Sequence, residues 1–337
     1  MLGIARALPE GIEPHFVSMS EAHHLVRDFG YPSEYFPSSR KLGVGKGAWN
    51  ERFLAWLVPR LTALEADGVV IDHVNPPPLF AELGRELPHI ARVWVRRGLW
   101  KGGVNAAAVD SHHWFDLVIQ PGDVAESFDP SARRLRLAGA SHVAPVTLLD
   151  PIDLVDRAAS HTALGLDAAR PAVLLKLTDG DPDVLADMSA HAVAHLRSVL
   201  PDVQVFTPKH PLHDDRPHED PAVVSVPVYP VARYLPGFEF CVSSAGYNSV
   251  HDAVMAHAPT IFVPHRQTGV DDQALRSSVL AAGGAAHHAA TVDGSAFRSA
   301  IVDLASSGGQ ERCRAALAAV ARPNGARQAA ALIGSSI

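Results

Sequence analysis

The segment 238–264 constrains the fold of this chain more than any other stretch. An apolar run at Phe240–Val242 predicts a buried strand, and the small residues Ser243–Gly246 predict a tight turn after it. Apolar residues at helical spacing from Val250 indicate a helix, and Ile261–Val263 indicates a second strand between prolines. Strand, turn, helix and strand in this order form the unit of a parallel α/β sheet. A helix N-terminus at the end of a strand also favours a phosphate.

Length and composition restrict the class of protein. The chain has 337 residues, of which 47% are hydrophobic, and this suits two α/β domains. The net charge of −7 argues against nucleic-acid binding by the whole surface. With only Cys241 and Cys313, neither a disulfide framework nor a Cys-rich zinc site is expected. No apolar run is long enough to span a bilayer and no signal peptide opens the chain, so we expect a cytoplasmic protein.

Strands and helices alternate along both halves of the chain. In the first half we expect strands at 15–19, 69–73, 91–97 and 117–119, helices at 20–29, 49–66 and 76–87, and a loop at 31–46. In the second half we expect strands at 172–177, 203–206, 223–227 and weakly at 284–290, with helices at 152–165, 182–199 and 271–282 and further helices to Ile333. The predicted fold class is α/β, with two doubly wound Rossmann-like domains, 1–150 and 151–337, facing each other across a cleft.

The beginning of the chain departs from this pattern. The residues 2–8 indicate part of a helix, whereas a parallel α/β domain normally begins with a strand and a turn before its first helix. Either the fold starts with a helix or the sequence lacks an N-terminal piece. We favour a missing strand and Gly-rich loop.

The segments 242–264, Asp271–Gln273 and Gly283–Ala286 together resemble the GT-B glycosyltransferases. The resemblance is to the family 28 type, which includes the lipid-linked GlcNAc transferase of peptidoglycan synthesis. It implies transfer of a sugar from a UDP-type nucleotide sugar to a hydroxyl of a small-molecule, glycan or lipid-linked acceptor. It also implies inversion at the anomeric carbon, with no metal ion or other cofactor required.

The same resemblance implies a donor site. The turn at Ala245–Tyr247 lets the backbone approach a pyrophosphate, and Asp252 matches an acid, usually Glu, that holds ribose hydroxyls. The segment 229–234 matches the connection that meets the base, while Asp272 and Gln273 match a pair that binds the donor sugar. The expected donor-binding residues are Thr178, Gly180, Val231, Ala232, Ser244, Ala245, Gly246, Tyr247, Asn248, Ser249, Asp252, Asp272 and Gln273.

The catalytic base is harder to place. The residues 2–18 resemble the helix and strand that follow the family's Gly-rich loop, and in that family the loop often carries a His proposed as the base. That loop is not in this sequence, and Gly43–Gly45 lacks the preceding strand needed to replace it. The remaining candidates are Asp72 and His73 at the end of a predicted strand, with His23 a weaker one.

Purely structural roles compete with these assignments. The Ser244–Gly246 turn could serve only strand-to-helix packing, and Asp252 could be an exposed helix acid. Asp272 and Gln273 could mark only the charged start of a helix, and Asp72 with His73 could only cap a strand.

Two polar segments resemble metal sites superficially. Asp181 and Pro182 are expected to be the N-cap and first residue of the helix at 182–199, because Pro182 and a missing glycine spoil a calcium loop with Asp179 and Asp183. The polar segment 210–220 has metal-capable residues without ordered spacing, so we expect a loop.

The run from Arg92 to Lys101 alternates basic and aromatic residues. It is either a buried strand with Trp94 inside or a surface patch that contacts an acceptor or a membrane.

Two other functions on the same fold compete with sugar transfer. One is a nucleotide-sugar hydrolase or epimerase, and the other is a non-catalytic nucleotide-sugar binding protein.

Overall fold

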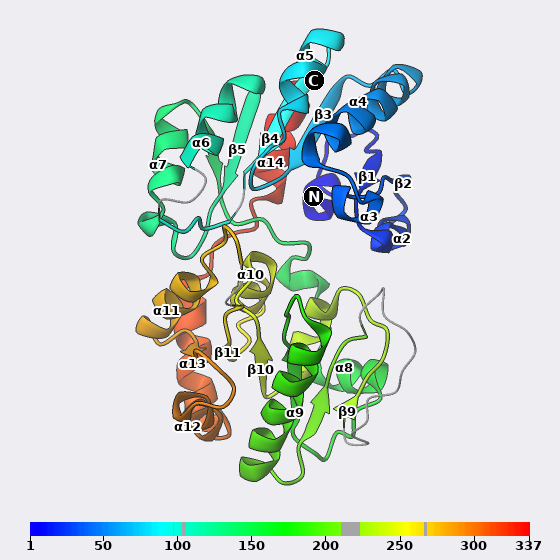
Figure 1. Cartoon of the computed structure of the whole chain (residues 1–337). Coiled ribbons are helices and arrows are strands. Elements are labelled where there is room, and N and C mark those ends of the chain that lie inside the picture. Colours follow the sequence, from blue (N-terminus) through cyan, green and yellow to red (C-terminus); the bar gives the residue numbers. More distant parts are fainter. Residues whose placement is uncertain (97, 103–105, 210–222, 266–267) are drawn as a thin grey trace. The chain divides into compact units, whose positions relative to one another are not determined.

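The computed structural model describes residues 1–96, 98–102, 106–209, 223–265 and 268–337. The chain divides into two compact α/β units, and Figure 1 labels their elements. The first unit comprises 1–122, 127–148 and 324–337, and the second comprises 123–126 and 149–323. The main division at 148/149 lies close to the expected 150/151, but 324–337 belongs to the first unit and 123–126 to the second.

The first unit contains a sheet of four parallel strands in the order β3-β4-β5-β6. These are β3 (Gly68–Asp72), β4 (Ala91–Val95), β5 (Leu117–Pro121) and β6 (Ser141–Val143). A separate parallel pair is formed by β1 (Phe16–Ser18) and β2 (Ser33–Tyr35). The α-helices are α1 (Leu2–Ala5), α2 (His24–Arg27), α3 (Ser39–Leu42), α4 (Lys46–Ala63), α5 (Leu79–Glu86), α6 (Ala106–Val109), α7 (Pro130–Leu137) and α14 (Ala326–Gly334), with 3₁₀ turns η1 (Glu21–His23) and η2 (Asp110–Trp114).

The expectation of a loop at 31–46 is wrong in part, because this segment contains β2 and α3. The hydroxyl of Ser38 accepts a hydrogen bond from the backbone N–H of Lys41 and so caps α3. Gly43, with a φ of 65°, ends the helix in the left-handed conformation that glycine adopts easily. Short elements of this kind depend on caps and pairing partners more than on an apolar period, so the pattern alone missed them.

The core of the first unit explains why α14 belongs to it. Its buried members are Ile4, Val93, Val95, Ile119, Val143, Ala329, Ala330 and Ile333. The last three lie on one face of α14, and Gly325 at the start of that helix lies so close to the carbonyl of Ala144 that a Cβ would collide. The C-terminal helix therefore completes the core around β4 and β5.

The second unit contains a six-stranded parallel sheet in the order β12-β11-β10-β7-β8-β9. Its strands are β7 (Ala172–Lys176), β8 (Gln204–Phe206), β9 (Val223–Val224), β10 (Phe240–Ser243), β11 (Thr260–Phe262) and β12 (His287–His288). The α-helices are α8 (Arg157–Leu164), α9 (Pro182–Val199), α10 (Tyr247–Met255), α11 (Gln273–Ala282), α12 (Ser295–Leu304) and α13 (Ser307–Val320), with 3₁₀ turns η3 (Glu126–Phe128), η4 (Pro151–Asp153) and η5 (Val231–Gly237). The η3 turn spans the division at 126/127.

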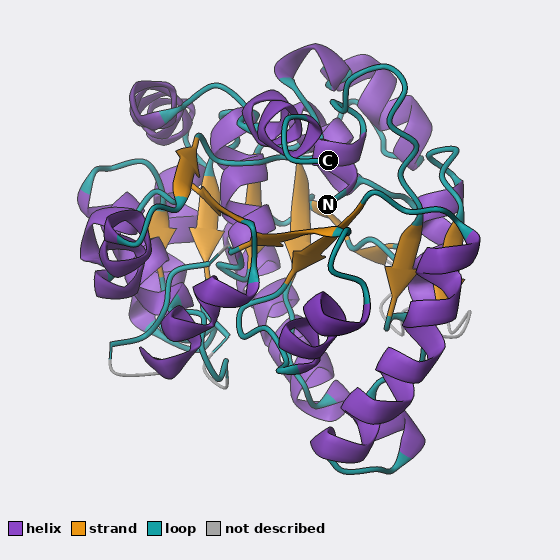
Figure 2. Ribbon diagram, turned by 90° about the horizontal axis from the view of Figure 1, so that it is seen from above, coloured by secondary structure: helices purple, strands orange, loops and turns teal. Residues whose placement is uncertain are grey.

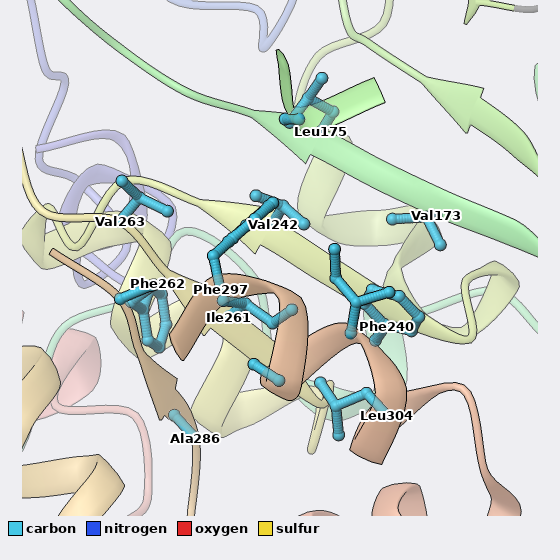
Figure 3. Close-up of a cluster of buried hydrophobic side chains, with 14 of the residues drawn as sticks. Val173, Leu175, Phe240, Val242, Ile261, Phe262, Val263, Ala286, Phe297 and Leu304 are labelled. Carbon is cyan, nitrogen blue, oxygen red and sulfur yellow. The ribbon is translucent and has the colours of Figure 1, made fainter. Parts of the chain in front are cut away.

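The core of the second unit lies around its central strands. Figure 3 shows Val173 and Leu175 of β7, Phe240 and Val242 of β10, and Ile261 of β11 in one cluster with Phe297 and Leu304 of α12. Near-continuous apolar strands are typical of parallel sheets that helices cover on both faces, and helices flank the strands in Figure 2. This packing holds the ends of β7, β10 and β11 in fixed register.

Among the described residues, no helix combines the length and apolar character that crossing a bilayer requires.

Candidate functional site

The strand order of the second unit marks a candidate site. The chain proceeds outward from β7 through β8 to β9, and then returns to form β10 on the other side of β7. In open parallel sheets a ligand usually binds at the carboxyl ends of the two strands where the order reverses. Here those strands are β7 and β10, and β10 leads directly into the small-residue turn predicted from the sequence.

Gly246 stands at the N-cap of α10, and no side chain caps this helix. Its φ of −65° and ψ of 155° are open to any residue, so the backbone conformation does not require glycine. Packing does not require it either, since a Cβ there would meet nothing closer than Nε2 of Gln273 at 3.8 Å. The space beside Gly246 is therefore open to a group that approaches the backbone, and strand-to-helix packing alone does not account for this glycine.

Two polar contacts fasten the turn to the end of β7. The hydroxyl of Ser244 accepts a hydrogen bond of 2.9 Å from the backbone N–H of Thr178, and the N–H of Ser244 donates to the carbonyl of Lys176 at 3.1 Å. Thr178 and Gly180 are exposed in the loop that follows β7. The structure thus brings the predicted residues Thr178 and Ser244 together.

Asp252 on α10 and Lys176 at the end of β7 are both half-buried, and their charges influence each other. The ammonium Nζ of Lys176 donates to Oγ of Ser249 at 3.2 Å, one helical turn before Asp252 on α10. Burial raises the pKa of Asp252 to about 6, and the charge of Lys176 counteracts part of this effect. Asp252 is therefore not an exposed helix acid. Sequence reasoning missed Lys176, although a lysine that ends an apolar strand was a usable signal.

The segment before η5 interacts electrostatically with Asp252. Burial and then the negative charge of Asp252 raise the pKa of Tyr229. Val231 and Ala232 are buried at the start of η5. This is the segment that the sequence assigned to base recognition.

The residues at the start of α10 divide between core and surface. Tyr247 is buried and its ring centroid lies 4.2 Å from that of His251. His251 donates through Nδ1 to the carbonyl of Tyr247 at 2.8 Å, and burial lowers its pKa. Asn248 is exposed and Ser249 half-buried. Tyr247 therefore serves packing, whereas Asn248 and Ser249 lie where a ligand could reach them.

The two residues of the expected pair, Asp272 and Gln273, have different roles in the structure. Oδ1 of Asp272 accepts from the backbone N–H of Leu275 at 3.0 Å and caps α11. Gln273 is buried, and its Oε1 accepts from the backbone N–H of His265 at 3.0 Å, which leaves Nε2 on the side of Gly246. Gln273 therefore faces the turn directly, while Asp272 has a structural function at the same position.

His265, which sequence reasoning did not single out, follows β11 in the same group of loops. Its Nδ1 lies 3.3 Å from Oδ2 of Asp179, and both side chains are largely buried. Asp179 and His265 follow β7 and β11, the two neighbours of β10. The His265–Asp179 pair therefore lies on the segments that follow the two strands next to β10, the strand that leads into the Gly246 turn.

Asp181 is the N-cap of α9, as predicted, with its carboxylate accepting from the backbone N–H groups of Asp183 and Val184. The loop expected at 210–220 lies outside the described residues.

Asp72 and His73 lie at the end of β3 in the first unit. Nδ1 of His73 accepts a hydrogen bond of 2.9 Å from the backbone N–H of Asn75, and its carbonyl accepts from the indole of Trp94 at 2.7 Å. Burial lowers the pKa of His73. Asp72 is half-buried.

The basic and aromatic run that begins in β4 is mainly internal. Trp94 and Trp100 are buried, and Arg96 is 2% exposed in an ion pair of 2.7 Å with Asp129. These three side chains cannot form a surface patch, which favours the buried-strand interpretation. Arg97 lies outside the described residues.

No family model matches the sequence, and no curated protein matches it either. Among solved structures, the Acinetobacter baumannii glycosyltransferase MurG has a TM-score of 0.61 at 15% identity, over 99% of this chain and 94% of that one. The spinosyn rhamnosyltransferase SpnG complexed with thymidine diphosphate has a TM-score of 0.54 at 15% identity, over 91% and 87%. A Listeria monocytogenes protein assigned as a UDP-N-acetylglucosamine 2-epimerase has a TM-score of 0.66 at 13% identity, over 99% and 92%. The chain therefore has the GT-B fold, with two Rossmann-like units, as its sequence predicted.

Proposed function

We propose that this protein is a glycosyltransferase that moves a sugar from a UDP-type nucleotide sugar to an acceptor hydroxyl, with inversion and without a metal ion. The observation that carries the proposal is the uncapped N-terminus of α10 at Gly246, beside open space and at the strand-order reversal. A helix N-terminus concentrates N–H groups and positive potential, and therefore suits a diphosphate. The two Cys residues are free and buried, which supports a cytoplasmic enzyme.

Each of the remaining donor-site residues contacts a different part of the nucleotide sugar. Asp252 accepts hydrogen bonds from the ribose, and the segment at Tyr229–Ala232 meets the base. Asn248 and Ser249 add side-chain donors for the diphosphate. Gln273 contacts the sugar through Nε2. Two distant proteins of similar fold, S. aureus MnaA with UDP and SpnG with thymidine diphosphate, support a nucleotide ligand and leave its nucleobase to be determined.

The local chemistry favours Asp72 over His73 as the base. A neutral imidazole that accepts a hydrogen bond at Nδ1 carries its proton on Nε2, so Nε2 can only donate, and the basic lone pair on Nδ1 is already occupied by the N–H of Asn75. Because burial lowers the pKa of His73, this neutral form prevails at pH 7. The side chain of Asp72 ends in oxygens that can accept the proton of an acceptor hydroxyl.

Replacing Asp72 with Asn tests this assignment. We expect turnover to fall by about 100-fold or more with UDP affinity unchanged, because general-base catalysis typically contributes that much. His73→Gln preserves an acceptor for the N–H of Asn75 and should lower turnover by less than about fivefold. The reverse order of effects, measured as kcat beside calorimetric UDP affinity, would assign the base to His73.

A second function, hydrolysis or epimerisation of the nucleotide sugar, is favoured by the His265–Asp179 pair and by the likeness to the Listeria protein. An imidazole beside a carboxylate can move a proton without any acceptor sugar. The discriminating experiment follows UDP-sugars with and without a panel of acceptors. If the protein is a transferase, UDP is released only when an acceptor is present. UDP release or sugar isomerisation without one would establish the alternative, and binding with no turnover under either condition would indicate a binding protein.

A further inference from the structure

Arg276 is the most completely buried charged residue in the described part of the second unit. It lies on α11, and its side chain is 0% exposed. Nε lies 2.9 Å from Oδ2 of Asp123, while NH1 and NH2 lie 3.1 and 2.6 Å from the two carboxylate oxygens of Asp271. Burial opposes the guanidinium charge, yet the two carboxylates hold the pKa of Arg276 above its ordinary value. The arginine is therefore charged and fixed in one orientation.

One further contact of Arg276 is directed at the backbone of the candidate site. NH1 donates a hydrogen bond of 2.8 Å to the carbonyl oxygen of Ala245, the residue just before Gly246. A buried ion pair alone would need only the carboxylates. The contact with Ala245 instead connects the fixed charge to the peptide that joins the turn to α10.

The geometry of that peptide transmits the constraint to Gly246. The only cis peptide bond in the described part of the chain is Tyr229–Pro230, so the bond between Ala245 and Gly246 is trans. In a planar trans peptide the C=O and the N–H point in opposite directions. With the carbonyl of Ala245 held by Arg276, the N–H of Gly246 points away from the buried guanidinium. If this peptide rotated, its carbonyl oxygen would replace the N–H and repel an anion.

We infer that Arg276 is a positioning residue that holds the N–H of Gly246 toward the donor diphosphate, an inference that rests on the proposed function. Asp271 and Asp123 support it by fixing the guanidinium. Arg276 itself touches no substrate in this scheme. Its effect is therefore confined to ligands that carry the phosphates, and this restriction separates positioning from a general structural role.

The test compares UDP with uridine, in calorimetric titrations of wild type and Arg276→Lys, with TDP and thymidine in parallel. A lysine fits the site but cannot hold two carboxylates and a carbonyl together. We expect UDP affinity to fall about 10- to 100-fold, the usual effect of losing a hydrogen bond to a charged group, and uridine affinity to change less than twofold. The matched control is Arg96→Lys, which disturbs the other buried Arg–Asp pair, with Asp129. It should alter neither affinity.

The outcomes separate this inference from the function on which it rests. If wild type binds neither diphosphate more tightly than its nucleoside, the proposed donor site fails and the inference with it. If wild type prefers the diphosphate and Arg276→Lys keeps the same preference, only the inference is overturned. Should Arg276→Lys not fold, Asp271→Asn leaves the arginine but loosens NH1 and NH2, and it should lower UDP affinity about threefold or more with uridine unchanged. An equal change for both ligands would again overturn the inference.

Discussion

At the scale of single residues, Gly246 is a glycine that folding does not require and that the proposed donor site does. Neither its backbone angles nor its neighbours require a glycine in the free protein. Gly309 is the opposite case, since a Cβ there would collide with the carbonyl of Asp303. The two glycines therefore allow a matched test of what each one does.

Gly246→Val should leave the melting temperature within a few degrees of wild type and weaken UDP binding about tenfold or more, because the added side chain occupies the approach to the backbone. Gly309→Ala should lower the melting temperature and leave UDP affinity unaltered in the folded protein. Thermal unfolding and calorimetry of both variants check this. Unchanged UDP affinity in Gly246→Val would place the phosphates elsewhere.

Asp252 illustrates a residue whose proposed function opposes stability. Its pKa is about 6 in the folded protein and close to the ordinary value of about 4 when unfolded, so between these values the folded state binds more protons. The free energy of unfolding therefore falls as pH rises from about 4 to 6. Above pH 6 the ionised carboxylate destabilises the fold, although this form is the stronger acceptor for the ribose hydrogen bonds that we propose.

Asp252→Asn should accordingly stabilise the protein by roughly 2 kcal/mol at pH 8 and have little effect at pH 4. The same variant should weaken UDP binding at pH 8 and abolish the rise in affinity that wild type shows as pH increases through 6. Denaturant unfolding and calorimetry at several pH values measure both effects, with exposed Asp187 on α9 replaced by Asn as the control. A variant less stable than wild type at pH 8 would contradict the assigned burial cost.

At the scale of elements, the unit β10–α10–β11 was predictable because its signals are local. Apolar runs, small turn residues and prolines mark its boundaries within a short stretch of sequence. The surroundings of that unit were not predictable, because they come from distant segments. Lys176 reaches α10 and Arg276 reaches the turn through contacts over long sequence separations, and Asp123 in turn pairs with Arg276. A periodic pattern of apolar residues does not predict contacts between distant segments.

The start of α11 shows how one short motif serves two purposes. Asp272→Ala should cost about 1 kcal/mol of stability, the usual effect of removing an N-cap, whereas Asp272→Ser should restore most of it. If capping is its main role, Asp272→Ser should also keep near-normal turnover. Gln273→Leu, by contrast, should raise KM for the UDP-sugar with UDP affinity less affected. Loss of turnover in a stable Asp272→Ser variant would return Asp272 to the sugar site, as the sequence first indicated.

At the scale of the whole molecule, the sequence predicted two Rossmann-like units of the GT-B fold, and this is confirmed. It did not predict that α14 completes the core of the first unit, because Ala329, Ala330 and Ile333 would suit any apolar surface. Which core a helix packs against depends on the topology of the whole chain, and the apolar period of the helix does not specify that topology. Residues proposed to bind the donor nevertheless meet in the second unit, where Thr178 after β7 contacts Ser244 after β10, and Gln273 contacts His265 after β11.

The decisive measurement for the proposed donor site is a structure of the protein with UDP bound. We expect a diphosphate oxygen within hydrogen-bonding distance of the backbone nitrogen of Gly246, with the ribose hydroxyls at Asp252 and the uracil beside Val231 and Ala232. UDP bound away from the carboxyl ends of β7 and β10, or bound there with the carbonyl of Ala245 turned toward the phosphates, would contradict it.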